Sequence, residues 1–384
     1  MIQDSPDLDT PHPLVAPLFD PVTLGSLNLR NRLVMAPMTR AFSPGGVPGA
    51  NVADYYRRRA EGGVGLIVTE GTWVGHPSAS NDPNVPNFYG DEALAGWGEV
   101  CRQVHEAGAK IVPQLWHIGA AAKSEVAEIY DDREAQENDR LGPSGLVKEG
   151  VEGGRPMAAD EIEAVIDAYA EAGASAAALG FDGVEIHGAH GYLVDQFFWH
   201  ETNARSDDFG GDVAARTRFA AEIVRRIRSR TPADFTVILR FSQWKMQDYG
   251  ARAWPTPDDL EAFLRPLVDS GVDIFHCSQR RYWEPEFAGS DLNLAGWTRK
   301  LSGKPTITVG SVTLSAEMIS TLMEGETATP RAIADLVERL ERHEFDLVAV
   351  GRALITNPDW PKMVASGRAG SLNAFSVSAL AELS

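Results

Sequence analysis

The chain has 384 residues, 43% of them hydrophobic, and a formal net charge of −19. This length exceeds a typical single domain but fits a barrel with inserted loops. The strong negative charge argues against nucleic acid and anionic membranes as partners, because both attract basic surfaces.

The N-terminal region predicts a loose arm followed by a hairpin. Residues 1–17 are rich in Pro and Asp and contain no basic or apolar leader, so we expect no signal peptide. No run approaches the ~20 apolar residues of a membrane span, and a cytoplasmic protein is expected. Residues 22–29, with Gly25-Ser26 as the two-residue turn, predict a β-hairpin that could close the bottom of a barrel.

Eight short apolar runs predict buried parallel strands, because each is rich in Val or Ile and lacks polar alternation. They cover residues 33–36, 65–69, 110–115, 183–186, 237–240, 273–276, 306–309 and 347–350. Segments with helical spacing lie between them, and such alternation indicates an α/β fold with a parallel sheet. A doubly wound sheet is the rival, but eight units without Gly-x-Gly-x-x-Gly after the first strand favour a (β/α)8 TIM barrel.

Long insertions interrupt this alternation. Residues 118–157 follow the third strand, and residues 278–296 follow the sixth and contain Arg280-Arg281-Tyr282-Trp283. Residues 318–330 add a helical or loop piece before the seventh barrel helix. Loops this long are usually functional lids or disordered. We therefore expect an arm over 1–17, a barrel over 18–373 and a tail over 374–384.

Polar or small residues follow nearly every predicted strand. The C-terminal ends of barrel strands meet on one face, where barrel enzymes hold their active sites. Amide, imidazole and guanidinium groups dominate these positions, and carboxylates are few. We therefore expect these strand ends to form the wall of one pocket.

The sharpest of these segments contains His187, His190 and Tyr192, directly after the fourth strand. Two imidazoles three residues apart can donate two hydrogen bonds to one oxygen, and a nearby tyrosine can supply a proton. A metal pair is the alternative, with His117 and His276 as further ligands. The short Cys/His spacings of a closed metal site are missing, so we expect no metal.

Two further side chains point to a planar, polar ligand. Gln114 ends the third strand, and its amide offers both a donor and an acceptor, which matches a pyrimidine edge. Arg240 closes an apolar run, and it is either the partner of a buried acid or a counter-charge for an anion. Glu70 or Glu185 could be that acid, and the sequence leaves both interpretations open.

Small-residue turns follow strands seven and eight, at Gly310-Ser311 and Gly351-Arg352. In barrels these two loops commonly bind phosphate through backbone N–H groups, and an arginine can add a bidentate contact. Ordinary glycine turns are the alternative. Two such turns at the expected strands favour a phosphate site.

These residues together resemble the Old Yellow Enzyme family of FMN-dependent ene-reductases. The resemblance runs from about residue 18 to about residue 373. The segments that carry it are residues 31–40, 69–72, 114–117, 183–193, 203–211 and 350–358. The chain departs from the family where an arginine is missing after His117, where Ser311 replaces Asn or Gly, and in the two loops after strands six and seven.

The resemblance implies a noncovalent FMN. Thr39 would bond flavin O4, Gln114 would hold the pyrimidine edge at O2 and N3, and Arg240 would lie near N1 and O2. The remaining contacts to the flavin ring and phosphate would come from Pro37, Met38, Gly71, Gly310, Ser311, Gly351 and Arg352.

The same resemblance implies an NAD(P)H oxidoreductase that reduces activated C=C bonds of α,β-unsaturated carbonyls or nitroalkenes. His187 and His190 would hold the substrate oxygen, Tyr192 would donate the proton after hydride transfer from flavin N5, and Trp116 and Trp283 would line the substrate site. The partners would be NAD(P)H and a small alkene, and homo-oligomerisation stays open.

Three rival functions are compatible with a barrel of this kind. Dienoyl-CoA reductases and amine dehydrogenases have a similar barrel, but they carry a cysteine cluster and a further C-terminal domain, whereas this chain has two cysteines. A flavin-binding or redox-sensing protein without turnover is the third, and the intact set of His187, His190 and Tyr192 argues against it.

Overall fold

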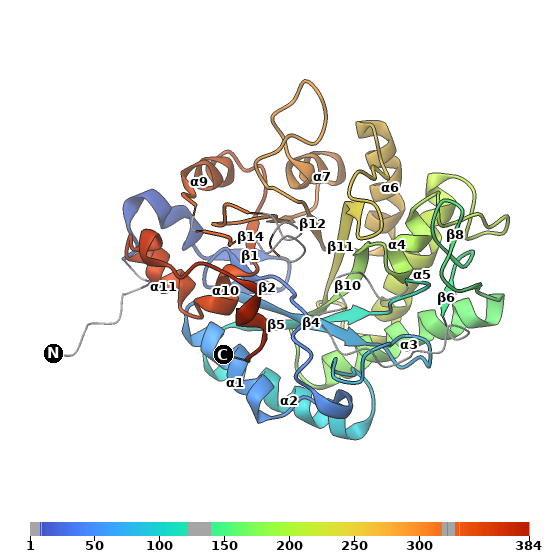
Figure 1. Ribbon diagram of the computed structural model, residues 1–384, viewed down its shortest axis with the longest axis horizontal. Coiled ribbons are helices and arrows are strands. Elements are labelled where there is room, and N and C mark those ends of the chain that lie inside the picture. Colours follow the sequence, from blue (N-terminus) through green and yellow to red (C-terminus); the bar gives the residue numbers. More distant parts are fainter. Residues whose placement is uncertain are drawn as a thin grey trace.

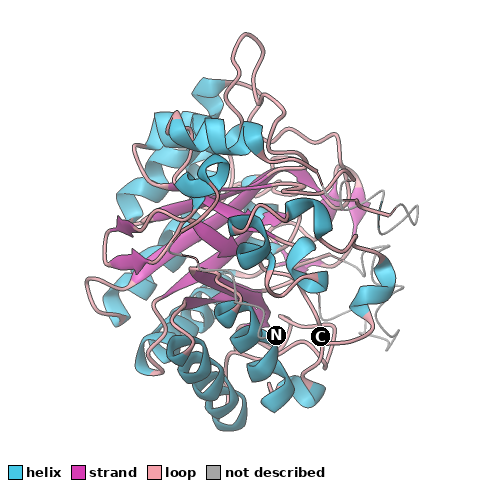
Figure 2. Ribbon diagram, turned by 90° about the vertical axis from the view of Figure 1, so that its left-hand side faces the viewer, coloured by secondary structure: helices cyan, strands magenta, loops and turns pink. Residues whose placement is uncertain are grey.

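Eight parallel strands close a barrel in the order β10-β11-β12-β13-β14-β3-β4-β5. The computed structural model describes residues 8, 10–121, 140–316, 321, 327–329 and 331–383. The barrel lies at the centre of the molecule with helices around it (Figures 1 and 2). Its strands are β3 (Leu33–Met35), β4 (Leu66–Trp73), β5 (Lys110–Trp116), β10 (Gly183–His190), β11 (Thr236–Lys245), β12 (Ile274–Ser278), β13 (Thr306–Val309) and β14 (Leu347–Val350). The predicted TIM barrel is confirmed.

Three of the strands continue at least four residues past their predicted ends. The apolar runs of β4, β10 and β11 end near Thr69, Ile186 and Arg240, but the strands continue to Trp73, His190 and Lys245. Polar residues normally end a buried run, but here they lie inside the barrel mouth, so the ladder of backbone hydrogen bonds continues past them. The predicted ends were therefore too early.

Helices follow the strands and cover the barrel from outside. They are α1 (Ala50–Glu61), α2 (Asp91–Glu106), α3 (Ala159–Ala178), α4 (Leu193–Phe198), α5 (Val213–Arg230), α6 (Pro257–Ser270), α7 (Leu294–Ser302), α9 (Ala334–Glu341), α10 (Ala353–Thr356) and α11 (Trp360–Ala365). The expected local signals are present in α5, where the Asp212 side chain accepts from Ala215 N–H at 2.8 Å and arginines occupy the last turn. Acceptors at the start and cations at the end suit the helix dipole.

The bottom of the barrel is apolar. The hairpin of β1 (Val22–Leu24) and β2 (Leu27–Leu29) is present as predicted. Leu27 and Leu29 join a buried cluster with inward residues of the strands, which include Val34, Leu66, Val112, Ile238, Ile274, Ile307 and Leu347. The hairpin therefore closes this end of the barrel.

A half-ring of polar side chains lies above this apolar floor. Gln114 pairs in register with Glu185 on the next strand, and Arg240 pairs with His276 on the strand after that. The opposite strands carry Ala36, Val68 and Ala349 in the apolar cluster instead. The barrel interior is thus polar on one side, directly below the mouth, where the sequence placed the pocket.

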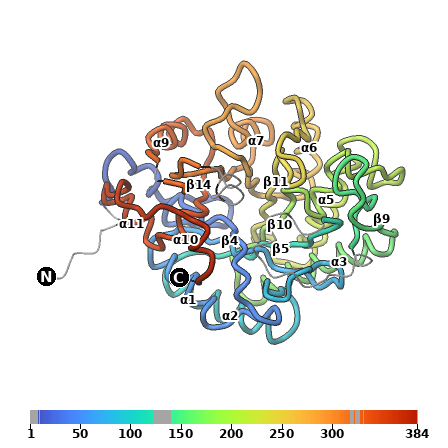
Figure 3. The backbone as a smooth tube through the Cα atoms, in the orientation of Figure 1, coloured from blue at the N-terminus to red at the C-terminus, as the bar shows by residue number. Residues whose placement is uncertain are grey.

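Segments outside the barrel pack against it. The C-terminal residues run beside α1, as the red end of the tube shows (Figure 3), and Arg40 donates to the Glu382 carbonyl at 2.6 Å. The fully buried Phe375 pairs with Ala328. The insertion after β5 forms two small sheets over residues 141–156, whereas its residues 122–139 and most of residues 318–330 lie outside the described part.

Among the described residues, no helix is both long enough and apolar enough to cross a membrane.

Candidate active site

Four aromatic and imidazole side chains meet at the barrel mouth. The His187 ring lies 5.1 Å from His190 and 5.2 Å from Tyr192, measured between ring centroids. Trp116, at the end of β5, lies 4.8 Å from Tyr192 and 5.9 Å from His187. The structure therefore brings together four of the five side chains predicted to contact substrate.

The backbone turn after β10 separates His187 from His190 and Tyr192. His187 lies within the strand and is buried, whereas His190 ends it with a φ of 67°, and Tyr192 caps α4. A positive φ is uncommon for a residue other than glycine. This turn leaves His190 and Tyr192 partly exposed, so both can face a ligand.

Both imidazoles are held neutral. Burial, with the positive charge of Arg240 as a second cause, holds the pKa of His187 and of His190 well below its ordinary value. A neutral imidazole carries one N–H and one lone pair. The pair therefore offers one donor from each ring to a substrate oxygen without adding positive charge.

Ser278 links Arg240 to His190, a role that the sequence pattern did not reveal. Arg240 Nη2 donates to Ser278 Oγ at 3.4 Å, and that oxygen lies 2.8 Å from His190 Nε2. A hydroxyl that accepts from arginine keeps its own proton to donate. This arrangement favours the His190 tautomer with the proton on Nδ1. In the sequence, the only signal for this role was the position of the serine at the end of a predicted barrel strand.

Gln114 is oriented by a buried carboxylate. Its Nε2 donates to Glu185 Oε1 at 2.7 Å, and Glu185 Oε2 accepts from His276 Nδ1 at 2.6 Å. Burial lowers the pKa of His276 and so favours the neutral ring, and the carboxylate beside Nδ1 favours the tautomer with the proton on that nitrogen. The sequence offered Glu185 only as a partner for Arg240. Strand alternation, which places Glu185 and His187 on one face, was the signal for this second role.

Arg240 fits both interpretations that the sequence left open, the partner of a buried acid and a counter-charge for a ligand. The attraction of Glu185 favours its charged form, although burial lowers its pKa. Its Nε has no hydrogen-bond partner in the part of the chain that the structure describes. Glu185 is thus its electrostatic partner, while at least one buried donor remains for a ligand.

Gly71 and Trp116 form another wall of the pocket. Trp116 stacks on Trp73 with centroids 4.2 Å apart, and a Cβ added at Gly71 would lie 2.5 Å from the Trp116 ring. Only glycine leaves room for this packing. On the neighbouring strand, Pro37, Met38 and Thr39 follow the buried β3 and are partly exposed at the same mouth.

The loops after β13 and β14 also come together. Gly310 has a φ of 154°, and a Cβ there would lie 2.7 Å from the Gln279 carbonyl oxygen. Ser311 turns its hydroxyl back to the Arg280 carbonyl at 3.0 Å. Arg352, after Gly351, reaches the same loop, because its guanidinium donates to the Ala316 carbonyl at 2.8 Å and to Thr321 Oγ1 at 2.7 Å.

Trp283, the fifth predicted substrate residue, packs elsewhere among the described residues. The Arg331 guanidinium lies 3.6 Å above its ring, and Tyr282 meets it edge-on at 5.0 Å. The ring contacts that join the other four residues do not include it. Its place in a substrate site stays a prediction.

The histidines proposed as additional metal ligands have other partners. His117 Nε2 lies 3.2 Å from Ser78 Oγ, and its Nδ1 accepts from Gly119 N–H at 3.0 Å. His276 bonds Glu185. Over the described ranges, no three His, Cys, Asp or Glu side chains form a group that could hold a metal ion.

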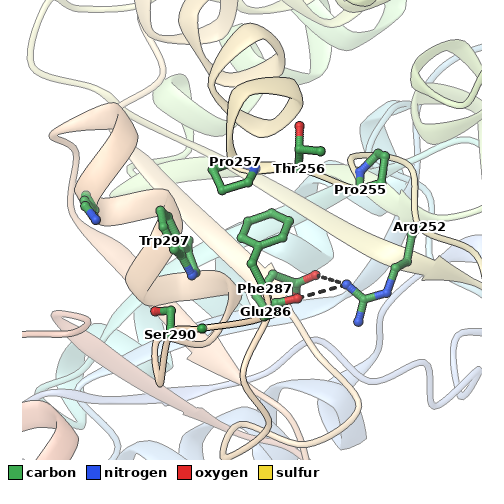
Figure 4. A pocket seen from close by; sticks show the side chains of 11 residues that line it. Arg252, Pro255, Thr256, Pro257, Glu286, Phe287, Ser290 and Trp297 are labelled. Atoms are coloured by element: carbon green, nitrogen blue, oxygen red, sulfur yellow. Dashed lines mark hydrogen bonds and ion pairs between the residues drawn. The ribbon is translucent and has the colours of Figure 1, made fainter.

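A surface groove lies between the loops after β11 and β12. Figure 4 shows its Arg252–Glu286 ion pair, with an N···O distance of 3.0 Å, beside Phe287 and Trp297. Glu286 also accepts from Gln243 Nε2 at 3.1 Å, and Gln243 exchanges two hydrogen bonds with the backbone of Trp254. These contacts brace the loop that follows β11.

Comparison with known proteins identifies the fold and the family. Residues 17–371 match the NADH:flavin oxidoreductase / NADH oxidase family. The chain belongs to this family. The structure of morphinone reductase in complex with tetrahydroNAD superposes with a TM-score of 0.76 at 28% identity, over 94% of this chain and 93% of that one. The resemblance to Old Yellow Enzymes is thereby confirmed.

Curated relatives extend over most of the chain. 12-oxophytodienoate reductase 1 of Oryza sativa subsp. japonica is 37% identical, over 90% of this chain and 85% of its own length. NADH oxidase of Thermoanaerobacter brockii is 33% identical over 91% of this chain, which spans about half (51%) of that relative. A probable inactive reductase, easA of Epichloe festucae var. lolii, is 36% identical over 70% of each chain.

The family holds FMN noncovalently and uses NAD(P)H. The residues of this chain fit such a group. Arg240 Nε, His187 Nδ1 and Trp116 Nε1 are buried polar atoms without a partner in the described part of the chain. Buried polar atoms are normally satisfied, so three such atoms around one mouth indicate that a polar ligand completes the site.

Proposed function

We propose that this oxidoreductase reduces the C=C bond of α,β-unsaturated carbonyls or nitroalkenes, with NAD(P)H as reductant. The observation that carries the proposal is the cluster of His187, His190 and Tyr192, with ring centroids 5.1 and 5.2 Å from His187. Two neutral donors beside a phenol match a substrate with one electron-withdrawing oxygen and one carbon that must be protonated.

The residues around the barrel mouth support binding of the flavin. Gln114 and Arg240 would hold its pyrimidine edge, and Gly310, Ser311, Gly351 and Arg352 would hold its phosphate. Pro37, Met38, Thr39 and Gly71 would line the ring. When bound, FMN supplies the hydride. Arg240 is a buried cation with an unpaired Nε, so it favours negative charge on the neighbouring edge of the ligand.

The protein's own residues supply the remaining chemistry. His187 and His190 donate to the carbonyl or nitro oxygen, which draws electrons from the alkene and stabilises the charge that develops there. Preorganised donors of this kind each contribute about 3 kcal/mol to lowering a barrier. Tyr192 lies on the same loop and donates the proton to the α-carbon, while Trp116 shields the site from one side.

The test separates the two half-reactions. The purified holoenzyme is reduced anaerobically with NAD(P)H, and an enone such as 2-cyclohexenone is then mixed in while flavin absorbance is followed. The proposal expects reoxidation by the enone that saturates with its concentration and yields the saturated ketone. Flavin that stays reduced with enones and nitroalkenes alike would contradict it.

A flavin-binding protein without turnover is the second candidate, because the relative easA is a probable inactive reductase. The same measurement decides between the two. A protein without turnover would retain flavin and accept electrons, but it would not pass them to an alkene.

A further inference from the structure

The turn that carries His190 is held by a buried ion pair outside the proposed site. His190 has a φ of 67°, and the chain must leave β10 abruptly there. Non-glycine residues keep such a conformation only when the surroundings fix it. The hydrogen bonds of the His190 and Gly191 backbone come from the end of β11 and from α4.

The backbone groups of His190 and Gly191 are anchored to those two elements. Gly191 N–H donates to Asp195 Oδ2 at 2.7 Å, and His190 N–H donates to Ser242 Oγ at 3.0 Å. The His190 carbonyl accepts from Met246 N–H at 3.2 Å. The orientation of the turn therefore depends on how α4 and β11 sit relative to one another.

Asp195 and Lys245 join those two elements. Lys245 Nζ lies 2.6 Å from Asp195 Oδ1, and neither side chain has any solvent exposure. Lys245 Nζ also donates to the Ser242 carbonyl at 2.9 Å, and the rings of Trp199 and Trp254 lie 5.9 and 5.5 Å from it. Asp195 thus contacts Lys245 with Oδ1 and accepts from the backbone of the His190 turn with Oδ2.

Ser242 also holds Trp244, whose ring packs against His190. Ser242 Oγ donates to the Trp244 carbonyl at 2.7 Å, and the Trp244 ring stacks on His190 with centroids 4.4 Å apart and planes 24° apart. Both the backbone of His190 and its stacking partner are therefore tied to one anchored segment. A buried ion pair is a weak source of stability, because desolvation offsets the attraction.

We propose that Asp195 and Lys245 are positioning residues that hold the His190 imidazole where it meets the substrate oxygen. The inference rests on the proposed function, since it assumes that His190 binds that oxygen. The ion pair of Asp195 and Lys245 would therefore control ligand affinity as well as stability. The affected ligands are those with an oxygen acceptor, such as phenols and enones, whereas FMN retention does not depend on this turn.

The experiment measures phenol binding to holoenzyme variants. Asp195→Asn and Lys245→Met each break the pair, and the double variant leaves no unpaired buried charge and so covers the case in which the single variants do not fold. Each is titrated with 4-chlorophenol while the long-wavelength absorbance of the flavin is followed. We expect Kd to rise at least tenfold and the KM for an enone to rise with it. FMN content should stay within about twofold of the wild type.

Two controls make the outcome decisive. Asp182→Asn removes the charge that pairs with Lys110 and His105 at the opposite end of β10, so it should lower the Tm without changing phenol affinity. His190→Ala should weaken phenol binding directly. If His190→Ala weakens binding and the Asp195 and Lys245 variants do not, the positioning role is overturned and the proposed function stands. If His190→Ala also has no effect, the proposed function fails.

Discussion

Gln114 donates a side-chain N–H to Glu185 across 2.7 Å, and this bond decides which way the amide faces. An ionised carboxylate can only accept, so the amide nitrogen must face Glu185. The amide oxygen and the second N–H are then left for the pocket. This acceptor and donor complement the N–H and C=O of a pyrimidine edge.

The first prediction follows from that bond. Glu185→Leu frees the amide to rotate, so we expect the apoprotein to bind FMN about 10- to 100-fold more weakly, the range for a lost hydrogen bond to a charged group. Flavin fluorescence during titration of the apoprotein measures this. Glu185→Gln keeps an acceptor for Gln114, and its loss should be smaller. Equal affinity in all three proteins would show that Glu185 does not orient the amide.

The sequence predicted which residues surround the mouth, because strand ends of a parallel barrel must meet there. It could not predict the contacts that join them across strands. The bond between Gln114 and Glu185 depends on the register of β5 against β10, which neither strand's own sequence fixes. The ion pair of Asp195 with Lys245 depends in the same way on how α4 packs on the end of β11.

The sequence located the starts of the barrel strands but not all of their ends. Hydrophobic runs reveal where a strand is buried, so the predicted starts of the barrel strands agree with the structure. The ends at His190 and Lys245 were missed because polar residues inside a barrel mouth resemble loop residues in sequence. Ser278 was overlooked because one serine carries no pattern, although it lies between Arg240 and His190.

The second prediction concerns the two neutral histidines. His187→Ala or His190→Ala should slow alkene reduction by about 10²- to 10³-fold, as for one lost oxyanion donor, while NAD(P)H still reduces the flavin. The pKa of each imidazole is held well below its ordinary value, so each is neutral at pH 7. The KM for a neutral enone should therefore be constant from pH 7 to 8. Stoichiometric zinc, with activity lost to chelators, would favour the metal interpretation instead.

The third prediction is a pH dependence of stability from Glu70. Its buried carboxylate accepts from the N–H groups of Arg40 and Ala41 at 2.9 and 3.0 Å, and burial raises its pKa from 4.5 to about 7. The folded state therefore binds more protons than the unfolded state between these values. The free energy of unfolding should fall as pH rises through this window, by about 3 kcal/mol in total.

Glu70→Gln keeps an oxygen for both N–H donors and removes the titration. Urea unfolding at pH 5 and pH 8 should show a smaller loss of stability in this variant than in the wild type. Glu61→Gln, at a half-exposed carboxylate on α1, should leave the pH dependence unchanged. A wild-type difference that Glu70→Gln does not reduce would assign the effect to other groups.

The fourth prediction concerns the phosphate end of the cofactor. Arg352 is held against the loop after β13 by its bonds to Ala316 and Thr321. Arg352→Ala should weaken FMN binding about 10- to 100-fold, because charge-assisted bonds to phosphate are lost. Riboflavin lacks the phosphate, so its affinity should be unchanged and serves as the control. Equal losses for FMN and riboflavin would show a structural role for Arg352 and no phosphate contact.

The fifth prediction rests on the hydroxyl of Tyr192. Tyr192→Phe keeps the ring that contacts Trp116 and His187, with centroids 4.8 and 5.2 Å away, and removes only the proton donor. The flavin spectrum and the NAD(P)H half-reaction should therefore stay near wild type. Enone reduction should fall about 10²- to 10⁴-fold, the usual contribution of a general acid.

Nitroalkenes provide the internal control for Tyr192, because their reduction leaves a nitronate that can depart and be protonated in water. Their rate should fall much less than that of enones in the same variant. Stopped-flow measurement of both half-reactions with both substrates separates proton donation from substrate binding. If enone reduction is unchanged, water or another group donates the proton. If both substrates slow equally, Tyr192 acts in binding, because loss of a proton donor alone would affect only the substrate that needs protonation before release.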